Sequence, residues 1–393
     1  MKCGWNAPEP TPISSASKFS GNFHRDEIAS LRRRGPVYSS TMVREGLVSQ
    51  KFPLNAWYAA AWSHEVGRRG ILARTVCGKP MALWRKADGG IAALDDACWH
   101  RLLPLSMGWI EGDDVVCRYH GLAFDGSGQC TRVPGREKPN AQARVVKYPV
   151  VEKHRFVWVW PGDPARADAS LVPDMRWNDD PEWAGDGETM FAKCDYRLFI
   201  DNLMDLTHES FVHATSIGNS AVAETPMTTT HEGRTVTVRR EMENVDAPPF
   251  WRAQLGKPGP VDRWQIIRFE APCTIVLDVG VAPAGTGALR GDRSHGVNGR
   301  VLNTITPETS GTCMYFWSLV RNYKIRDQSL TTGLREANAK IFLEDQVVVE
   351  AQQREIEARG EGMLRNLEID AGSMRARRII EEMIAAETEA GPA

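Results

Sequence analysis

The sequence lacks the features of a membrane-spanning, nucleic-acid-binding or disulfide-rich protein. Its 393 residues include no run of about 18 apolar residues, the length that a membrane-spanning helix needs. Lysine and arginine total 48 against 50 acidic residues, so no basic excess exists to attract nucleic acid or an anionic membrane. Only eight cysteines are scattered along the chain, too few for a disulfide framework. We therefore expect reduced thiols, a cytoplasmic protein, and neither a membrane nor a nucleic acid as a partner.

The composition changes twice along the chain, which indicates three parts. Residues 1–50 are rich in serine, proline, glycine and arginine and have no apolar core of a secretory signal, so we expect a disordered extension. Residues 51–165 contain short apolar runs separated by glycine and aspartate turns, a pattern typical of a small β domain. Residues 166–393 contain longer alternating strands and then two helical stretches, at about 327–358 and 371–387. Strands followed by long helices predict an α+β domain.

Two short segments mix cysteine with histidine. Cys98 and His100 form a C-x-H motif, and Cys117 and His120 form a C-x-x-H motif after sixteen intervening residues. A Rieske [2Fe–2S] cluster requires this set of ligands, two cysteines on one iron and two histidines on the other. Zinc is the alternative, because two cysteines and two histidines also suit a tetrahedral site. We interpret the motifs as a cluster site, and we expect residues 132–135 to close over it.

A second group of candidate ligands follows in residues 201–213. His208 and His213 are five residues apart, which on a straight α-helix places them about 140° from each other. They can share a metal only if the helix ends or widens between them; otherwise they are two unrelated histidines. Asp201, Asp205 and His208 have helical spacing, so we predict that they share one face. An acid beside a histidine suits an orienting role, although Asp205 is alternatively a solvated acid near a helix start.

The helix predicted at about residues 327–358 carries an acid on its apolar face. The stripe expected to be buried comprises Leu334, Asn338, Ile341, Asp345, Val348 and Gln352. A buried carboxylate costs several kcal/mol unless it is paired or binds a cation. Either an arginine pairs with Asp345, or Glu344 is the buried acid, or Asp345 is a metal ligand. Two histidines and one carboxylate form the facial triad of a non-haem Fe(II) oxygenase, for which a Rieske cluster is a natural electron source.

With both groups of ligands in place, the chain resembles the Rieske non-haem iron oxygenases over about residues 50–390. Within that family it is most similar to the vanillate O-demethylase oxygenase components. The stretches that carry this similarity are 51–58, 194–198, 200–209, 247–252 and 261–265. The chain departs from the family at Trp99, where proline is usual, and at Leu102-Leu103, which replace a small pair.

The resemblance implies a Rieske β domain followed by a helix-grip α+β catalytic domain. It implies that the four Cys/His residues hold the cluster, and that His208, His213 and Asp345 hold Fe(II). It places Asn202 and Asp205 at the catalytic site, with Asp205 bridging to His120 of a neighbouring subunit. The assembly implied is a homotrimer, served by a separate flavin and iron–sulfur reductase that uses NADH.

The activity that the resemblance implies is O-demethylation of a methoxy-substituted aromatic acid with O2, releasing formaldehyde. The alternatives are hydroxylation of the ring or an alkyl group of another aromatic acid, and an electron carrier without catalysis. We expect the substrate pocket to draw on strands near 264–269 and on a mobile glycine-rich loop at 282–300.

Overall fold

The computed structural model describes residues 51–139 and 141–389. The disorder predicted for residues 1–50 therefore lies outside the described residues. Within the described part of the chain, no helix combines the length and the apolar character that a membrane span requires. All seven cysteines in this part are buried and free of disulfides.

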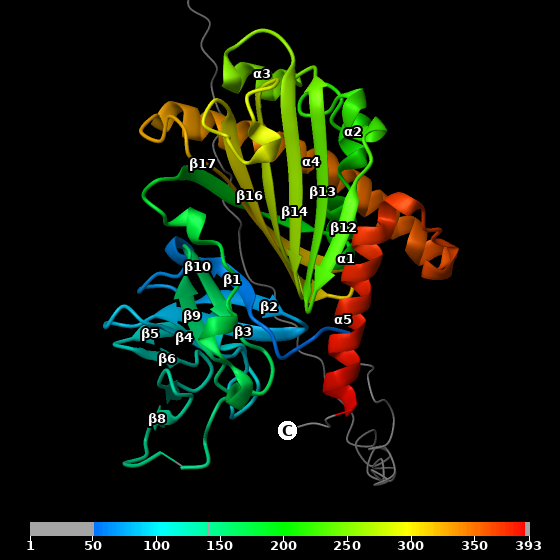
Figure 1. Cartoon of the computed structure of the whole chain (residues 1–393). Helices are drawn as coiled ribbons and strands as arrows, with labels where there is room; N and C mark the ends of the chain where they lie inside the picture. The colour runs from blue at the N-terminus through cyan, green and yellow to red at the C-terminus, as the bar shows by residue number, and fades with distance from the viewer. Residues whose placement is uncertain (1–50, 140, 390–393) are drawn as a thin grey trace, which may run out of the picture. The chain divides into compact units, whose positions relative to one another are not determined.

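Three small antiparallel sheets form the first part of the fold (Figure 1). The first sheet has the order β1 (Tyr58–Trp62), β10 (Phe156–Val159), β9 (Val150–Lys153). The second has the order β2 (Leu72–Val76), β3 (Lys79–Arg85), β4 (Ile91–Asp95). The third has the order β5 (Trp109–Glu111), β6 (Asp114–Val116), β7 (Ala123–Phe124), β8 (Cys130–Arg132). The two Cys/His motifs lie in the loops before β5 and between β6 and β7, as their position between strands suggested.

A seven-stranded antiparallel sheet forms the second part. Its order is β11 (Ala184–Ala192), β17 (Thr312–Arg321), β16 (Val297–Thr309), β15 (Thr274–Pro283), β14 (Val261–Glu270), β13 (Thr235–Val245), β12 (Thr228–Glu232). The predicted loop at 282–300 is longer than the observed one, because β15 continues to Pro283 and β16 begins at Val297.

The helices sit against this sheet. They are α1 (Tyr196–Met204), α2 (Ser220–Glu224), α3 (Pro249–Leu255), α4 (Gln328–Arg359) and α5 (Ala371–Glu389). The two long helices match the predicted stretches, and α4 crosses the sheet while contacting β11 and β17 (Figure 1). The prediction of an α+β fold is confirmed.

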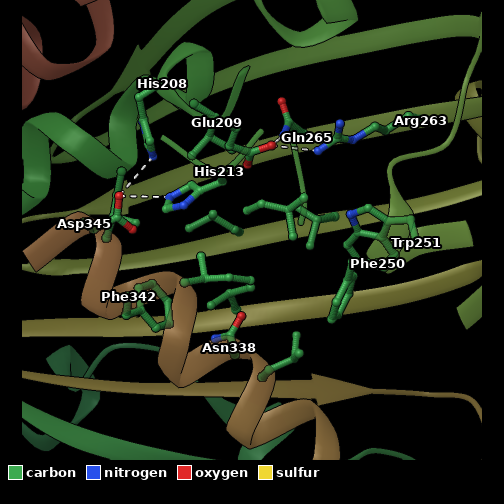
Figure 2. Close-up of a pocket in the computed structure, with 18 residues that line it drawn as sticks. His208, Glu209, His213, Phe250, Trp251, Arg263, Gln265, Asn338, Phe342 and Asp345 are labelled. Atoms are coloured by element: carbon green, nitrogen blue, oxygen red, sulfur yellow. Dashed lines mark hydrogen bonds and ion pairs between the residues drawn. The ribbon is translucent and has the colours of Figure 1, made fainter. Parts of the chain in front are cut away.

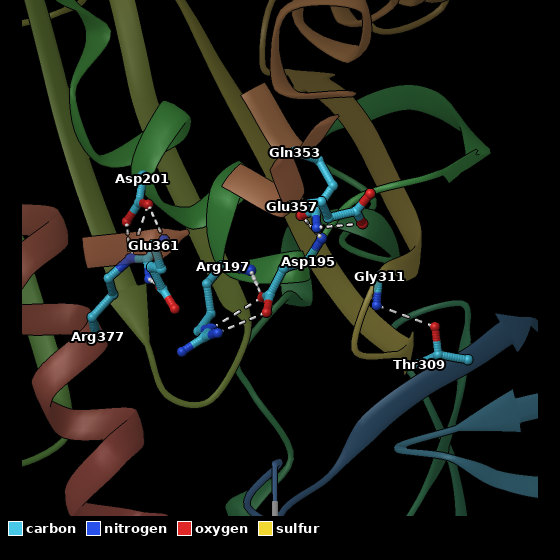
Figure 3. Close-up of polar contacts among 9 residues, drawn as sticks. All are labelled: Asp195, Arg197, Asp201, Thr309, Gly311, Gln353, Glu357, Glu361 and Arg377. Carbon is cyan, nitrogen blue, oxygen red and sulfur yellow. Dashed lines mark hydrogen bonds and ion pairs between the residues drawn. The ribbon is translucent and has the colours of Figure 1, made fainter. Parts of the chain in front are cut away.

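Polar contacts fix the long helices to α1 (Figure 3). Arg377 of α5 makes a bidentate contact with Asp201 of α1, with Nε–Oδ1 at 2.9 Å and Nη2–Oδ2 at 2.6 Å. Gln353 of α4 accepts a hydrogen bond of 2.9 Å from the backbone N–H of Asp195, the residue that caps α1. These contacts hold α1, and therefore the segment that follows it, in a fixed position relative to α4.

The alternation of side chains along the sheet strands gives two apolar faces. One face, with Leu277, Val301 and Leu319, belongs to the main core that includes residues of α1 and α4. The other face, with Val276 and Phe316, packs in a cluster with tryptophans of the first part. The core on the helical side is therefore where α1, α4 and the sheet meet, and the candidate site lies there.

Candidate active site

The two Cys/His loops have the same backbone turn. In each loop the cysteine N–H donates to a carbonyl five residues later, and its own carbonyl accepts from the N–H four residues later, at 2.8–2.9 Å. The fourth residue after each cysteine has a left-handed backbone, with φ 59° at Leu102 and 72° at Gly121. Glycine adopts this conformation without strain, whereas a leucine side chain makes it costly. Leu102 therefore retains the loop geometry despite its departure from the family pattern.

The four candidate cluster ligands come together at these turns. Cys98 and Cys117 are each 1% exposed, and their thiols are close enough to interact. His100 and His120 are exposed, and their Nδ1 atoms lie 3.2 Å apart. Burial raises the pKa of the Cys98 thiol to about 11, and a bound iron would favour the thiolate instead. Inner thiols and outer imidazoles suit a [2Fe–2S] cluster with one iron buried and the other near the surface.

The predicted covering loop does lie beside these ligands. Val133 and Pro134 line one hollow together with His100 and His120. A Cβ placed on Gly121 would come within 3.0 Å of Cγ of Pro134, so this loop packs directly on the second ligand turn.

The segment that carries the other two histidines is not one continuous helix. α1 ends at Met204, Asp205 is extended with φ −127° and ψ 101°, and a 3-10 helix follows at Leu206–Ser210. The Asp205 carboxylate accepts from the N–H of Thr207 at 2.9 Å, a capping contact that competes with continuation of the helix.

The prediction that Asp201, Asp205 and His208 share one helical face is consequently wrong. Asp201 faces Arg377 instead, and the chain turns between it and His208. His208 and His213 can nevertheless share a metal, because the chain around them does not form one straight α-helix. The helix ends before His208, and the two imidazole rings come together with centroids 5.3 Å apart.

His208, His213 and Asp345 converge on one point (Figure 2). Oδ1 of Asp345 lies 3.0 Å from Nε2 of His213 and 3.4 Å from Nε2 of His208. Asp345 is 2% exposed, and within residues 51–139 and 141–389 no arginine or lysine pairs with it. A buried carboxylate that faces two imidazoles and one neutral amide favours a cation beside it, and this donor set fits Fe(II).

The register predicted for α4 is correct at Asp345 and wrong further along. Asp345 is buried, whereas the side chain of Glu344 is 44% exposed. The buried stripe continues through Val349 and Gln353 rather than Val348 and Gln352. The prediction alternated steps of four and three residues, but a straight α-helix has 3.6 residues per turn, so the stripe drifts.

Each histidine is oriented by a contact on its other nitrogen. His213 Nδ1 lies 2.6 Å from Oε2 of Glu344, and His208 Nδ1 donates to the backbone carbonyl of Asp205 at 2.7 Å. Both Nε2 atoms therefore face Asp345. Burial alone would lower the pKa of His213, but the hydrogen bonds and charges of Asp345 and Glu344 raise it above its ordinary value. The orienting role predicted for Asp205 is filled by its backbone carbonyl, while its carboxylate accepts from the N–H of Thr207.

Asn202, the other residue predicted at the catalytic site, contacts the acid directly. Its Nδ2 donates to Oδ1 of Asp345 at 3.1 Å. Asn202 therefore holds the carboxylate of Asp345 from α1. Because Arg377 of α5 binds Asp201 of the same helix, Asn202 also connects the metal site to α5.

A mostly apolar pocket opens from the triad (Figure 2). Its apolar lining comprises Leu203, Leu206, Ile217, Phe250, Trp251, Leu277, Val279, Val301, Leu319, Ile341 and Phe342. The strands predicted near 264–269 do contribute, although of residues 264–269 themselves only Gln265 lines the pocket, and the predicted source at 282–300 is wrong because none of its residues does. The pleat explains the first result, since alternate residues of β14 face away from the pocket.

Three buried polar residues lie at one end of the pocket, and two of them, Glu209 and Arg263, were not predicted to line it. Arg263 Nη2 and Gln265 Nε2 both donate to Oε2 of Glu209, at 2.7 and 2.8 Å. Burial lowers the pKa of Arg263, and the charge of Glu209 opposes this effect. Arg263 and Gln265 are two residues apart on β14, so their side chains face the same way. Two polar residues on one face of an otherwise apolar strand were the sequence signal that could have identified them as pocket residues.

Arg240 connects this polar group to Asp205. Its Nη1 lies 3.5 Å from Oε1 of Gln265, and its Nη2 lies 2.8 Å from Oγ1 of Thr207 and 3.7 Å from Oδ1 of Asp205. A buried chain of polar contacts therefore runs from the end of α1 to the pocket.

Comparisons with known proteins agree with this arrangement. Residues 56–150 match the Rieske [2Fe-2S] domain family, and residues 192–386 match the vanillate O-demethylase oxygenase C-terminal domain family. A vanillate O-demethylase oxygenase subunit of a Pseudomonas strain is 43% identical over 87% of this chain and 98% of that protein. An iron–sulfur subunit of the toluene-4-sulfonate monooxygenase system of Comamonas testosteroni is 36% identical over 86% of this chain and 98% of its own length. A crystal structure of dicamba monooxygenase with non-haem iron and dicamba is 34% identical, with a TM-score of 0.75 over 86% of this chain and 99% of that chain.

Proposed function

Because the chain belongs to the Rieske oxygenase family that includes the vanillate O-demethylase oxygenase subunits, we propose that it is the oxygenase component of an O-demethylase. Its substrate would be a methoxy-substituted aromatic acid such as vanillate. The observation that carries the proposal is the group formed by His208, His213 and Asp345, which opens onto a mostly apolar pocket, in a chain that also has the Cys/His loops.

The cofactors are a Rieske [2Fe–2S] cluster and a mononuclear non-haem iron. Cys98 and Cys117 would hold one cluster iron, and His100 and His120 the other. His208, His213 and Asp345 would hold the mononuclear iron. When bound, the two centres supply the electrons and the oxidising power that C–H oxidation by O2 requires.

The residues of the chain position the reactants. Glu344 and the Asp205 carbonyl keep the Nε2 atoms of both histidines directed at the site, and Asn202 holds the carboxylate. Apolar residues such as Phe250 and Trp251 exclude water and hold the aromatic ring. An aryl methyl ether, O2, two electrons and two protons give a phenol, formaldehyde and water, through a hemiacetal that collapses once the methyl carbon is hydroxylated.

We also propose that the chain works as a homotrimer and that electrons pass between subunits. Asp205 would link His208 to His120 of a neighbouring subunit. Exposed apolar side chains on both surfaces support this arrangement. On and near the cluster loops they are Trp99, Leu102, Met107, Trp109 and Tyr119, and near the triad they are Phe211, Leu343, Val347 and Val348. A head-to-tail contact between two different surfaces closes into a ring, which a trimer satisfies.

The electron donor would be a separate reductase with flavin and an iron–sulfur centre, supplied by NADH. Similar proteins are an oxygenase subunit of vanillate O-demethylase and the oxygenase component of dicamba O-demethylase, and these names support a separate partner protein. The seven buried free thiols of the described residues support a reducing, cytoplasmic location.

A second candidate is hydroxylation of an alkyl group on another aromatic acid. It is favoured by the 36% identity to the toluene-4-sulfonate monooxygenase subunit. The electron-carrier alternative leaves the second metal group and its pocket without a role.

The test is turnover of a set of methoxybenzoates with NADH and a flavin/iron–sulfur reductase. The proposal expects formaldehyde and the matching phenol in equal amounts, and about three irons per chain. A hydroxylated product without formaldehyde would favour the second candidate, and about two irons per chain would favour the carrier.

A further inference from the structure

The polar groups of the active-site pocket fall into two kinds. Glu209, Arg263 and Gln265 satisfy one another through hydrogen bonds, and the charges of Glu209 and Arg263 cancel. Asn338 on α4 is different. Its Nδ2 is buried and has no hydrogen-bond partner among the residues that the structure describes.

Asn338 occupies a position where an apolar residue would be stabilising. It is 7% exposed, and the neighbouring positions of the buried stripe are Leu334 and Ile341. A buried amide without a partner costs free energy, whereas an apolar side chain of similar size costs none. The carboxamide points into the pocket, on the same face of α4 as Asp345 and two turns before it (Figure 2). This placement suggests that its partner is a molecule that enters the pocket.

We propose that Asn338 is a specificity-determining residue, whose carboxamide donates a hydrogen bond to an oxygen substituent on the substrate's aromatic ring. The inference rests on the proposed function and adds which substituent of the substrate Asn338 selects. The oxygen belongs to a ring carboxylate or a phenolic group, both of which accept from an amide. The carboxamide can rotate to present its NH2 group without changing its shape. A neutral donor suits the pocket, because Arg263, which also lines it, is already neutralised by Glu209.

The test measures binding to the metal-loaded, anaerobic protein by calorimetry, with the wild type and Asn338→Leu. The probes are 3-methoxybenzoate, 2-methoxyphenol and methoxybenzene, which carry a carboxylate, a phenol and neither group. Asn338→Leu should weaken binding of at least one of the first two probes by roughly 10- to 100-fold. Its affinity for methoxybenzene should be unchanged. The probe that is weakened identifies the oxygen source.

Two controls separate recognition from structure. Ile341→Val, one turn away in the same pocket, should alter binding of all three probes alike. The melting temperature of substrate-free Asn338→Leu should stay the same or rise, because an unpaired buried amide is removed. A fall in melting temperature with equal loss for all probes would assign Asn338 a structural role and overturn the proposal. Unchanged affinity for both oxygen-bearing probes would also overturn it.

The outcomes remain distinct from those that test the proposed function. If the wild type releases formaldehyde but Asn338→Leu binds every probe normally, the O-demethylase assignment stands and the role of Asn338 fails. If the probes bind with the expected selectivity but no formaldehyde forms, the role of Asn338 stands and the O-demethylase assignment fails.

Discussion

We predict that the contact between Glu344 and His213 contributes measurably to the affinity of the site for Fe(II). Glu344→Ala removes the acceptor that lies 2.6 Å from Nδ1 of a histidine that is 1% exposed. Without it, the ring loses the contact that keeps Nε2 directed at Asp345. Removing such an outer contact typically weakens metal binding 10- to 100-fold, or about 1.4–2.7 kcal/mol. The side chain of Glu344 is 44% exposed, so water can replace part of the contact, and we expect a loss near 10-fold.

The assay is competition for Fe(II) with a chelator of known affinity, followed by iron analysis, while the visible spectrum reports that the cluster is intact. Glu336→Gln is the matched control, because Glu336 is an exposed acid on the same helix and makes no contact with the site among the described residues. An affinity within twofold of the wild type for Glu344→Ala would refute the orienting role. An equal loss in Glu336→Gln would show that the effect is only the charge of the helix.

Three further predictions concern the metal centres and one concerns the N-terminal residues. Cys117→Ser should remove the visible absorption of the cluster and all turnover; a full Rieske spectrum would refute the assignment of the ligand loops. Asp345→Ala should keep that spectrum but lose the third iron and product formation, and if Glu344→Ala alone did so the ligand would be Glu344. Asp205→Asn preserves the cap on Thr207 but loses the charge, so both centres should remain while turnover falls about 100-fold; near-normal turnover would rule out the bridge to a neighbouring subunit. Removing residues 1–41, whose composition is poor in apolar groups, should shift the melting temperature by less than about 3 °C, and a larger drop would show that they pack.

The sequence predicted the elements that depend on regular periodicity. The strands of both parts and the two long helices follow from the alternation of apolar residues, and the resulting α+β fold is the one observed. Asp345 was identified by the same reasoning, because an acid on an apolar stripe needs an explanation. The structure brings it together with His208 and His213, while the ligand roles of these residues and the boundaries 1–50, 51–165 and 166–393 stay predictions.

What the sequence did not predict depends on local competition and on contacts distant in the chain. The end of α1 at Met204 follows from one capping contact of Asp205, which helical spacing cannot reveal. The pairing of Glu209 with Arg263 joins residues 54 positions apart, and only the folded sheet brings them into one pocket. The unpaired state of Asn338 is visible only once all of its neighbours are placed.

The position of Asn338 and Asp345 on a single helix has a consequence for regioselectivity. Seven residues of α-helix span about 10.5 Å, and this length is fixed by backbone hydrogen bonds rather than by loops. If Asn338 holds one ring substituent, the atom presented to the iron is determined by the length of the substrate between those two points. Changes in the surrounding loops would then alter how fast substrates enter, whereas a change at Asn338 would alter which carbon is presented to the iron.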